Sequence, residues 1–169
     1  MVDANGAYTA GQATRAGAEL DERGVHWFEE PVSSDDKPGL VEVRAAIAAD
    51  VAAGEYISDV YDAAAMAPVV DCLQLDTTRC GGYTGFLRCA AVAFAHNLQV
   101  SCHCAPALHA PVAAAIPNLR HVEWFSDHTR LEPLLVDGVP PVSGGAIHVP
   151  AAGPGLGMTL AASADDYRL

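Results

Sequence analysis

Short apolar runs alternate with longer Ala- and Leu-rich runs along most of the chain. Six short runs predict β-strands, at residues 2–5, 25–30, 50–56, 72–76, 98–104 and 120–125. Five longer runs carry apolar residues at helical spacing, at residues 9–24, 37–48, 58–70, 82–97 and 106–118. Because a helix-length connection lets successive strands pair in parallel, the pattern predicts an α/β fold.

A polar or titratable residue closes each predicted strand, and these residues recur at intervals of 20 to 27. They are Asp3, Glu29, Glu55, Asp76, His103 and Glu123. In a barrel, the ends of parallel strands share one rim, so every strand can supply a side chain to it. An open sheet would gather such residues at a single crevice. We therefore predict a partial (β/α) barrel of the TIM type.

The pattern of strands and helices stops before the C-terminus. Residues 137–157 are rich in Gly and Pro, which predicts an irregular segment. We assign residues 1–136 to the partial barrel and residues 137–169 to a C-terminal arm of the same domain.

Composition excludes several classes of protein. The chain is 51% hydrophobic and 18% charged over 169 residues, which fits one globular domain. Its net charge of −12 would repel nucleic acid. No stretch approaches the roughly 18 apolar residues of a membrane-spanning helix, and the N-terminus does not resemble a signal peptide. We expect a soluble, cytoplasmic protein without a membrane partner, whose five cysteines are buried reduced thiols.

Three of the strand-end residues predict a metal site. Asp3, Glu29 and Glu55 close three successive strands, and three converging anions repel one another unless a divalent cation lies among them. Oxygen ligands favour Mg²⁺, or Mn²⁺, over zinc. Any one of these carboxylates by itself is explained as a solvated strand end, but their regular spacing favours the metal.

Glu30 follows Glu29 directly, and adjacent side chains in a strand point to opposite faces. We expect one of the two to coordinate the metal and the other to form hydrogen bonds to the groups around it. Alternation alone leaves the choice open, because strand ends twist.

His103 lies one strand beyond Asp76, so the two can meet at neighbouring strand ends as an acid/base pair. A buried structural histidine is the alternative. The stretch "VSCHCAPALH" also offers Cys102, His103, Cys104 and His109 as a rival zinc site. Alternation argues against that site, because Cys102 and Cys104 would then face the helices.

Several motifs occur together and in order: "VDAN", "WFEEP", "AAGE", "LQLDTTRCGGYTG", "SCHCAPALH", "VEW" and "PGLG". Between residues 2 and 160 the chain thereby resembles the enolase superfamily, in particular its mandelate racemase-like branch, which includes acid-sugar dehydratases. The resemblance implies removal of the proton α to a carboxylate through an enediolate intermediate. Loss of a β-hydroxyl would follow in a dehydratase, and reprotonation in a racemase or epimerase. The implied substrate is a small carboxylate, an acid sugar or a 2-hydroxy acid.

The resemblance also implies roles for residues of this sequence. The Mg²⁺ ligands of the family match Asp3, Glu29 and Glu55, at the third to fifth barrel strands. Its Asp–His dyad and the Glu that hydrogen-bonds substrate match Asp76, His103 and Glu123. We place Arg79 and Glu30 among the residues that bind substrate.

Two departures from the family pattern bear on activity. Arg79 stands where a lysine is common, and a permanently charged guanidinium does not accept a proton. The first two strands, the lysine base on the second strand and the capping domain have no counterpart, and the only lysine is Lys37. We therefore expect a truncated barrel whose open edges pair with a second copy or with a complementing chain. The alternatives to an enzyme are a catalytically inactive remnant that binds metal and an interaction module that acts through its sheet edge.

Overall fold

A computed structural model of the chain describes residues 1–149 and 155–168. Residues 150–154 of the predicted arm, and residue 169, lie outside the described residues.

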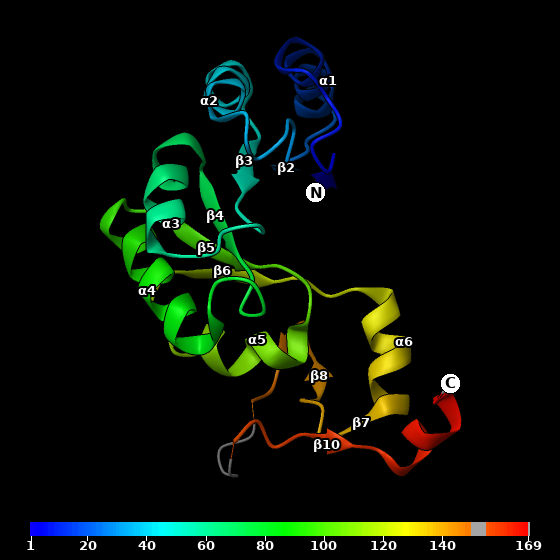
Figure 1. Ribbon diagram of the computed structural model, residues 1–169. Coiled ribbons are helices and arrows are strands. Elements are labelled where there is room, and N and C mark those ends of the chain that lie inside the picture. Colours follow the sequence, from blue (N-terminus) through cyan, green and yellow to red (C-terminus); the bar gives the residue numbers. More distant parts are fainter. Residues whose placement is uncertain (150–154, 169) are drawn as a thin grey trace.

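Six parallel strands form one sheet whose spatial order equals their order in the chain (Figure 1). They are β1 (Val2–Asp3), β2 (Trp27–Glu29), β3 (Asp50–Ala53), β4 (Cys72–Leu75), β5 (Gln99–Cys102) and β6 (Leu119–Val122). Sequential parallel order with a helix in every connection is the topology of a (β/α) barrel. The predicted α/β class and the partial barrel are confirmed. In the described ranges, β1 and β6 each pair with one strand of this sheet.

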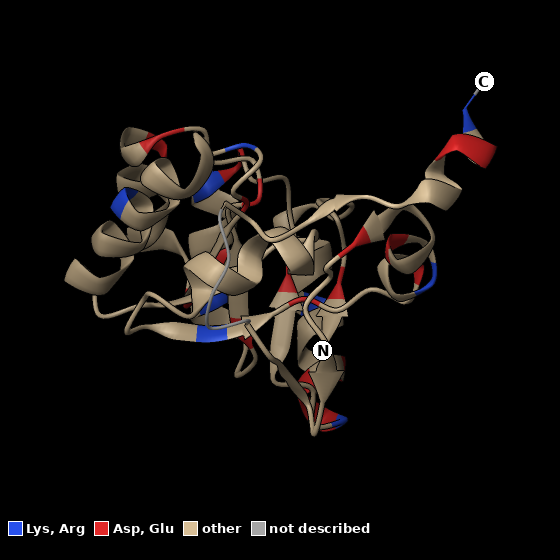
Figure 2. Cartoon of the chain, turned by 90° about the horizontal axis from the view of Figure 1, so that it is seen from below, with Lys and Arg blue, Asp and Glu red and all other residues tan. Residues whose placement is uncertain are grey.

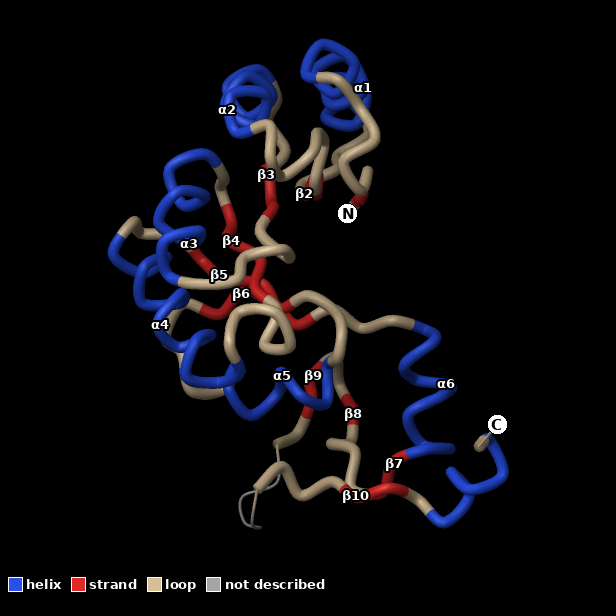
Figure 3. Tube along the Cα trace, viewed as in Figure 1, coloured by secondary structure: helices blue, strands red, loops and turns tan. Residues whose placement is uncertain are grey.

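Helices fill the connections and lie on the outer side of the curved sheet (Figure 3). They are α1 (Ala10–Glu22), α2 (Lys37–Ala46), α3 (Val60–Met66) with the 3₁₀ turn η1 (Ala67–Val69), α4 (Gly82–Ala95) and α5 (Pro106–Ala113). Side chains cap two of them: Asp36 accepts a hydrogen bond from the Gly39 amide, and Asp59 accepts from the amides of Tyr61 and Asp62. These caps satisfy amides that lack partners in the first helical turn.

A further helix, α6 (Ser126–Leu135), follows β6 and was not predicted. None of its residues is buried, and it contains Pro133, a residue type that usually ends a helix. The arm after α6 contains short elements: β7 (Val136–Asp137) pairs with β10 (Thr159–Leu160), and β8 (Val142–Ser143) pairs with β9 (Ala146–Ile147). The 3₁₀ turn η2 (Ala162–Tyr167) ends the described chain.

Period-2 alternation divides each strand between two environments. The outer positions pack against the helices and form the main core, which includes Phe28, Val51, Leu73, Leu75 and Val100. On the inner face, Trp27, Ala52 and Cys72 form a separate small apolar cluster. Two paired polar residues, Gln74 and Ser101, are fully buried on the same inner face.

Acidic residues occur on several elements, and basic residues are fewer, as the colouring of Figure 2 shows. No helix in the described part of the chain has the length and apolarity needed to span a bilayer.

Asp71 stabilises the junction between α2, β3 and β4. Its carboxylate accepts hydrogen bonds from Arg44 Nε at 2.7 Å and from the Val51 amide at 2.9 Å. Arg44 also donates to the carbonyl of Pro68 at 3.1 Å. One carboxylate, directly before β4, therefore contacts both α2 and β3.

We expect Asp71→Asn to lower the free energy of unfolding by about 1–3 kcal/mol, because an amide cannot accept both hydrogen bonds and loses the charge opposite Arg44. Urea denaturation followed by circular dichroism measures the change. The control is Asp127→Asn, whose ion pair with Arg130 is solvent-exposed and should contribute less than about 0.5 kcal/mol. Equal effects of the two substitutions would contradict the assignment.

Candidate active site

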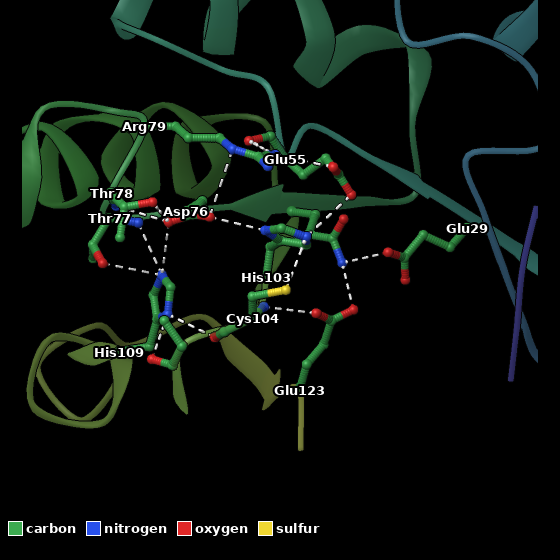
Figure 4. A network of polar contacts seen from close by, with 12 residues as sticks. Glu29, Glu55, Asp76, Thr77, Thr78, Arg79, His103, Cys104, His109 and Glu123 are labelled. Atoms are coloured by element: carbon green, nitrogen blue, oxygen red, sulfur yellow. Dashed lines mark hydrogen bonds and ion pairs between the residues drawn. The ribbon is translucent and has the colours of Figure 1, made fainter. Parts of the chain in front are cut away.

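The predicted site residues lie at or just beyond the carboxyl ends of the six strands. Asp3 and Glu29 are the last residues of β1 and β2, and Glu55 lies two residues after β3. Asp76, His103 and Glu123 directly follow β4, β5 and β6. Because the strands are parallel, these positions share one rim, and a network of polar contacts connects several of them (Figure 4).

Asp76 and His103 are in direct contact. His103 Nδ1 lies 2.9 Å from Asp76 Oδ2, while Asp76 Oδ1 accepts hydrogen bonds from the amide and the hydroxyl of Thr78, both at 2.7 Å. Burial alone would raise the pKa of Asp76, but the hydrogen bonds from His103 and Thr78 outweigh it and hold that pKa below its ordinary value. An ionised Asp76 accepts the Nδ1 proton, so Nε2 is the nitrogen that faces the rim.

Arg79 lies among the acids of the rim. Its NH1 atom is 2.9 Å from Glu55 Oε1 and donates to the Glu55 carbonyl at 3.2 Å, while its Nε is 3.9 Å from Asp76 Oδ2. The guanidinium also stacks on the Tyr56 ring, 4.7 Å from its centroid. Arg79 therefore offsets negative charge at Glu55 and Asp76. Its role in binding substrate stays a prediction.

Gln74 joins two rim carboxylates and was missed by the sequence analysis. Its Nε2 donates to Glu29 Oε1 at 2.8 Å and to Glu123 Oε1 at 3.0 Å. The second oxygen of Glu29 accepts from Trp27 Nε1 at 2.9 Å. The signal was present: an amide two residues before Asp76, within the otherwise apolar run of β4, falls on the inner face of the sheet.

Glu30 is almost completely buried, at 2% exposure, and its backbone takes the left-handed conformation with φ 38°. Its Oε1 has no hydrogen-bond partner in the described part of the chain. Burial, together with the nearby charges of Glu55, Asp3 and Glu29, raises the pKa of Glu30 to about 7. Burial likewise raises the pKa of Glu29 to about 7, although hydrogen bonds from Trp27 and Gln74 oppose the shift.

A hard divalent cation fits these observations. A buried carboxylate oxygen without a donor, crowded by other carboxylates, is a site where positive charge is strongly favoured. Asp3, Glu55 and either Glu29 or Glu30 would supply the oxygen ligands that Mg²⁺ prefers. Beside them, a hollow of about 460 Å³ is lined by Glu30 together with Asn5, Ser34 and Tyr56.

The structure does not, however, gather Asp3, Glu29 and Glu55 into a group of adjacent ligand atoms. Within the described residues, a single set of three His, Cys, Asp or Glu side chains has its ligand atoms within 4.8 Å of one another, and that set is His103, Cys104 and Glu123. Asp3 is exposed and accepts from the Asn5 amide, while Glu29 is held by Trp27 and Gln74. Neutral donors therefore satisfy Asp3 and Glu29 in this structure, and the three-carboxylate ligand set stays a prediction.

The expectation that Cys104 faces the helices was wrong. The strand β5 ends at Cys102, and the backbone turns left-handed at Cys104 (φ 52°) and Ala105 (φ 35°). This turn brings Cys104 Sγ to 3.2 Å from His103 Nε2, while the Cys104 amide donates to Glu123 Oε2 at 2.8 Å. Cys102, one residue before His103, is fully buried in the core, as expected.

His109 is not available as a ligand in the rival zinc set. Its ring is fully buried, Nε2 accepts a hydrogen bond from the Thr77 amide at 2.9 Å, and Nδ1 donates to the carbonyls of Cys104 and Ala105. Burial lowers the pKa of His109, which favours the neutral ring. His109 therefore fixes the loop after Asp76 against the turn at Cys104, and the four-residue zinc site is not formed.

Comparison with known proteins identifies relatives along nearly the whole chain. The family described as "Enolase C-terminal domain-like" matches residues 1–164. A 3,6-anhydro-alpha-L-galactonate cycloisomerase of Streptomyces coelicolor is 32% identical over 95% of this chain and 44% of its own length. The curated relatives that the chain matches are longer, and it spans 28% to 46% of their lengths.

Solved structures give the same result. A mandelate racemase/muconate lactonizing enzyme-like protein from Rubrobacter xylanophilus superposes with a TM-score of 0.92 at 44% identity, over 99% of this chain and 47% of that one. L-Talarate dehydratase from Polaromonas sp. JS666, in complex with Mg and L-glucarate, superposes with a TM-score of 0.87 at 29% identity, over 99% of this chain and 46% of that one.

The raised pKa of Glu30 predicts a pH-dependent cost to folding. The folded state keeps this proton up to about pH 7, whereas an unfolded glutamate releases it near its ordinary value of 4.5. Between these values the folded state binds more protons, so the contribution of Glu30 to the free energy of unfolding falls as the pH rises, on the order of 1 kcal/mol per pH unit. Glu30→Gln should therefore match the wild type near pH 4.5 and become more stable than it near pH 8.

Urea denaturation in the presence of a chelator, at several pH values, measures this difference. Comparing variant with wild type removes the opposite contributions of His109 and His121, whose pKa values are lowered mainly by burial. The exposed Glu22→Gln is the control and should show no pH-dependent difference. A constant difference for Glu30→Gln across this range would refute the prediction.

Proposed function

Because the chain belongs to the enolase C-terminal domain-like family, we propose that its rim serves Mg²⁺-dependent removal of the proton α to a carboxylate. The proposed substrate is an acid sugar or another 2-hydroxy acid. The observation that carries the proposal is the contact between Asp76 and His103 on the same rim as Glu30, a buried carboxylate with one oxygen that has no donor among the described residues. Dehydration is the favoured outcome, since several relatives are named as acid-sugar dehydratases.

His103 is the proposed proton-transferring group. With Nδ1 donating to Asp76, its Nε2 can accept a proton from the α-carbon, and the carboxylate of Asp76 stabilises the resulting imidazolium. In a dehydratase, the same imidazolium can then give its proton to the departing β-hydroxyl, which leaves as water. In a racemase, a second group on the opposite face would have to protonate the α-carbon. Asp76 holds the neutral His103 ring in the tautomer with its proton on Nδ1. Thr78 fixes the other oxygen of the Asp76 carboxylate.

The remaining rim residues bind and orient the substrate in this proposal. Glu123 can accept a hydrogen bond from a substrate hydroxyl, while Gln74 and the Cys104 amide keep its carboxylate in place. Arg79 supplies a fixed positive charge. Mg²⁺, held by Asp3, Glu55 and one or both of Glu29 and Glu30, would neutralise the substrate carboxylate and so acidify the α-proton.

A second candidate function is metal binding without turnover. It is favoured by one observation: Lys37, the only lysine in the sequence, is the first residue of α2 and belongs to none of the rim contacts. The residues labelled in Figure 4 include no lysine. Of the two histidines among them, His109 uses both ring nitrogens in hydrogen bonds, which leaves His103 as the histidine that can accept a proton from the substrate.

We expect Mg²⁺ to bind the rim, with affinity reduced more than about tenfold by Glu55→Gln, because an amide gives the cation a weaker ligand and leaves Arg79 unpaired. Isothermal titration calorimetry measures the affinity. Testing Glu29→Gln beside Glu30→Gln shows which of the two coordinates. The exposed Glu42→Gln is the control, and a loss of affinity in this variant equal to that in Glu55→Gln would refute the rim site.

The proton-abstraction step can be tested without knowing the final product. Acid sugars incubated with the protein and Mg²⁺ in D₂O should gain deuterium at the α-carbon, as read by NMR. His103→Asn should slow this exchange by about 10²–10⁴-fold, as expected for loss of a general base. The control His96→Asn replaces an exposed histidine and should exchange at the wild-type rate.

The two candidate functions give different results in these assays. Mg²⁺ binding without deuterium exchange on any acid sugar would favour the metal-binding remnant. Exchange that His103→Asn leaves unchanged would exclude His103 as the base.

A further inference from the structure

We propose that His103, Cys104 and Glu123 form a second cation site, selective for a thiophilic divalent ion such as Zn²⁺. Their ligand atoms all lie within 4.8 Å of one another, and His103 Nε2 is 3.2 Å from Cys104 Sγ. One nitrogen, one sulfur and one carboxylate oxygen are the donors that Zn²⁺ prefers, and a fourth position would be left for water.

Each of the three ligands is held by a neighbouring group. His103 donates from Nδ1 to Asp76 at 2.9 Å, the arrangement that directs Nε2 toward a metal in many zinc proteins. Glu123 accepts hydrogen bonds from Gln74 Nε2 and from the Cys104 amide (Figure 4). Cys104 is positioned by the left-handed turn at Cys104 and Ala105, after which helix α5 begins at Pro106. A cation would therefore find these side chains close to their coordinating positions.

The site is also accessible. All three residues are partly exposed, unlike Cys72, Cys80, Cys89 and Cys102, which are buried. On coordination the Cys104 thiol would release its proton to solvent, as thiolate ligands do. Mg²⁺ does not compete for such a site, because it coordinates oxygen and keeps its water ligands in preference to sulfur.

The thiophilic site shares its nitrogen with the proposed reaction. Glu55 Oε2 lies 3.3 Å from the same Nε2, so the two cation sites are adjacent. A Zn²⁺ ion bound to Nε2 would occupy the lone pair that is meant to accept the substrate proton. If the proposed function holds, Zn²⁺ inhibits the reaction without displacing Mg²⁺, whereas Zn²⁺ binding itself does not depend on that function.

Cobalt spectroscopy tests the site directly. Co²⁺ added to the wild-type protein should produce a thiolate-to-Co²⁺ charge-transfer absorption in the near-ultraviolet, which an all-oxygen site cannot give. Cys104→Ala should abolish this absorption, and the matched control Cys102→Ala, two residues away in the sequence and buried in the core, should retain it. Circular dichroism before and after addition shows that the chain is folded while the absorption is recorded.

A measurement on the wild type alone guards against a variant that fails to fold. Zn²⁺ should slow alkylation of Cys104 by iodoacetamide at least tenfold, as read by peptide mass spectrometry, while Mg²⁺ should not. Zn²⁺ should also displace Co²⁺ and bleach the absorption. The proposal is overturned if folded wild-type protein gives no charge-transfer absorption, if that absorption survives Cys104→Ala, or if Zn²⁺ leaves the alkylation rate unchanged.

These outcomes are separable from those of the proposed function. A charge-transfer absorption in a protein that shows no deuterium exchange would support the thiophilic site and count against the reaction. Deuterium exchange that Zn²⁺ does not inhibit, with no absorption, would do the reverse.

Discussion

Repulsion among carboxylates at one end of a parallel sheet is the constraint on which the rest of this structure depends. Parallel strands all end at the same rim, so the acids that follow them are brought together by the fold itself. Burial raises the pKa values of Glu29 and Glu30 to about 7, and the charges of the neighbouring carboxylates add to this rise. Nearly every other polar feature of the rim can be understood as a response to that charge.

The responses are local and differ from one carboxylate to the next. Arg79 supplies a full positive charge to Glu55. Glu29 and Glu123 receive neutral donors, from Trp27, from Gln74 and from the Cys104 amide. Among the carboxylates of the described residues, Glu30 alone has a buried oxygen without a hydrogen-bond donor. The carboxylates of the rim therefore differ in how fully their charge is balanced. The least balanced of them, Glu30, lines the hollow beside Tyr56.

The sequence predicted the strands and the strand-end acids well, because both follow from periodicity and from the parallel topology. Gln74 was within reach of the same alternation rule but was passed over as part of an apolar run. Cys104 was beyond it, since a left-handed turn after a strand reverses the expected side and nothing in the residue type announces that turn. The choice between Glu29 and Glu30 was left open for a related reason: strand β2 ends at Glu29, and Glu30 already has a positive φ. The helix α6 was not predicted: it contains Pro133 and buries none of its residues.

Gln74 has a consequence for how the two sides of the rim communicate. One NH₂ group serves both Glu29, from β2, and Glu123, from β6, although these strands are far apart in the order of the sheet. If an incoming ligand draws Glu29 away, the amide is left with Glu123 as its remaining acceptor and can rotate toward it. Loss of the hydrogen bond to Glu29 would thereby strengthen the one to Glu123. The side-chain amide of Gln74 can in this way couple ligand binding at Glu29 to ligand binding at Glu123.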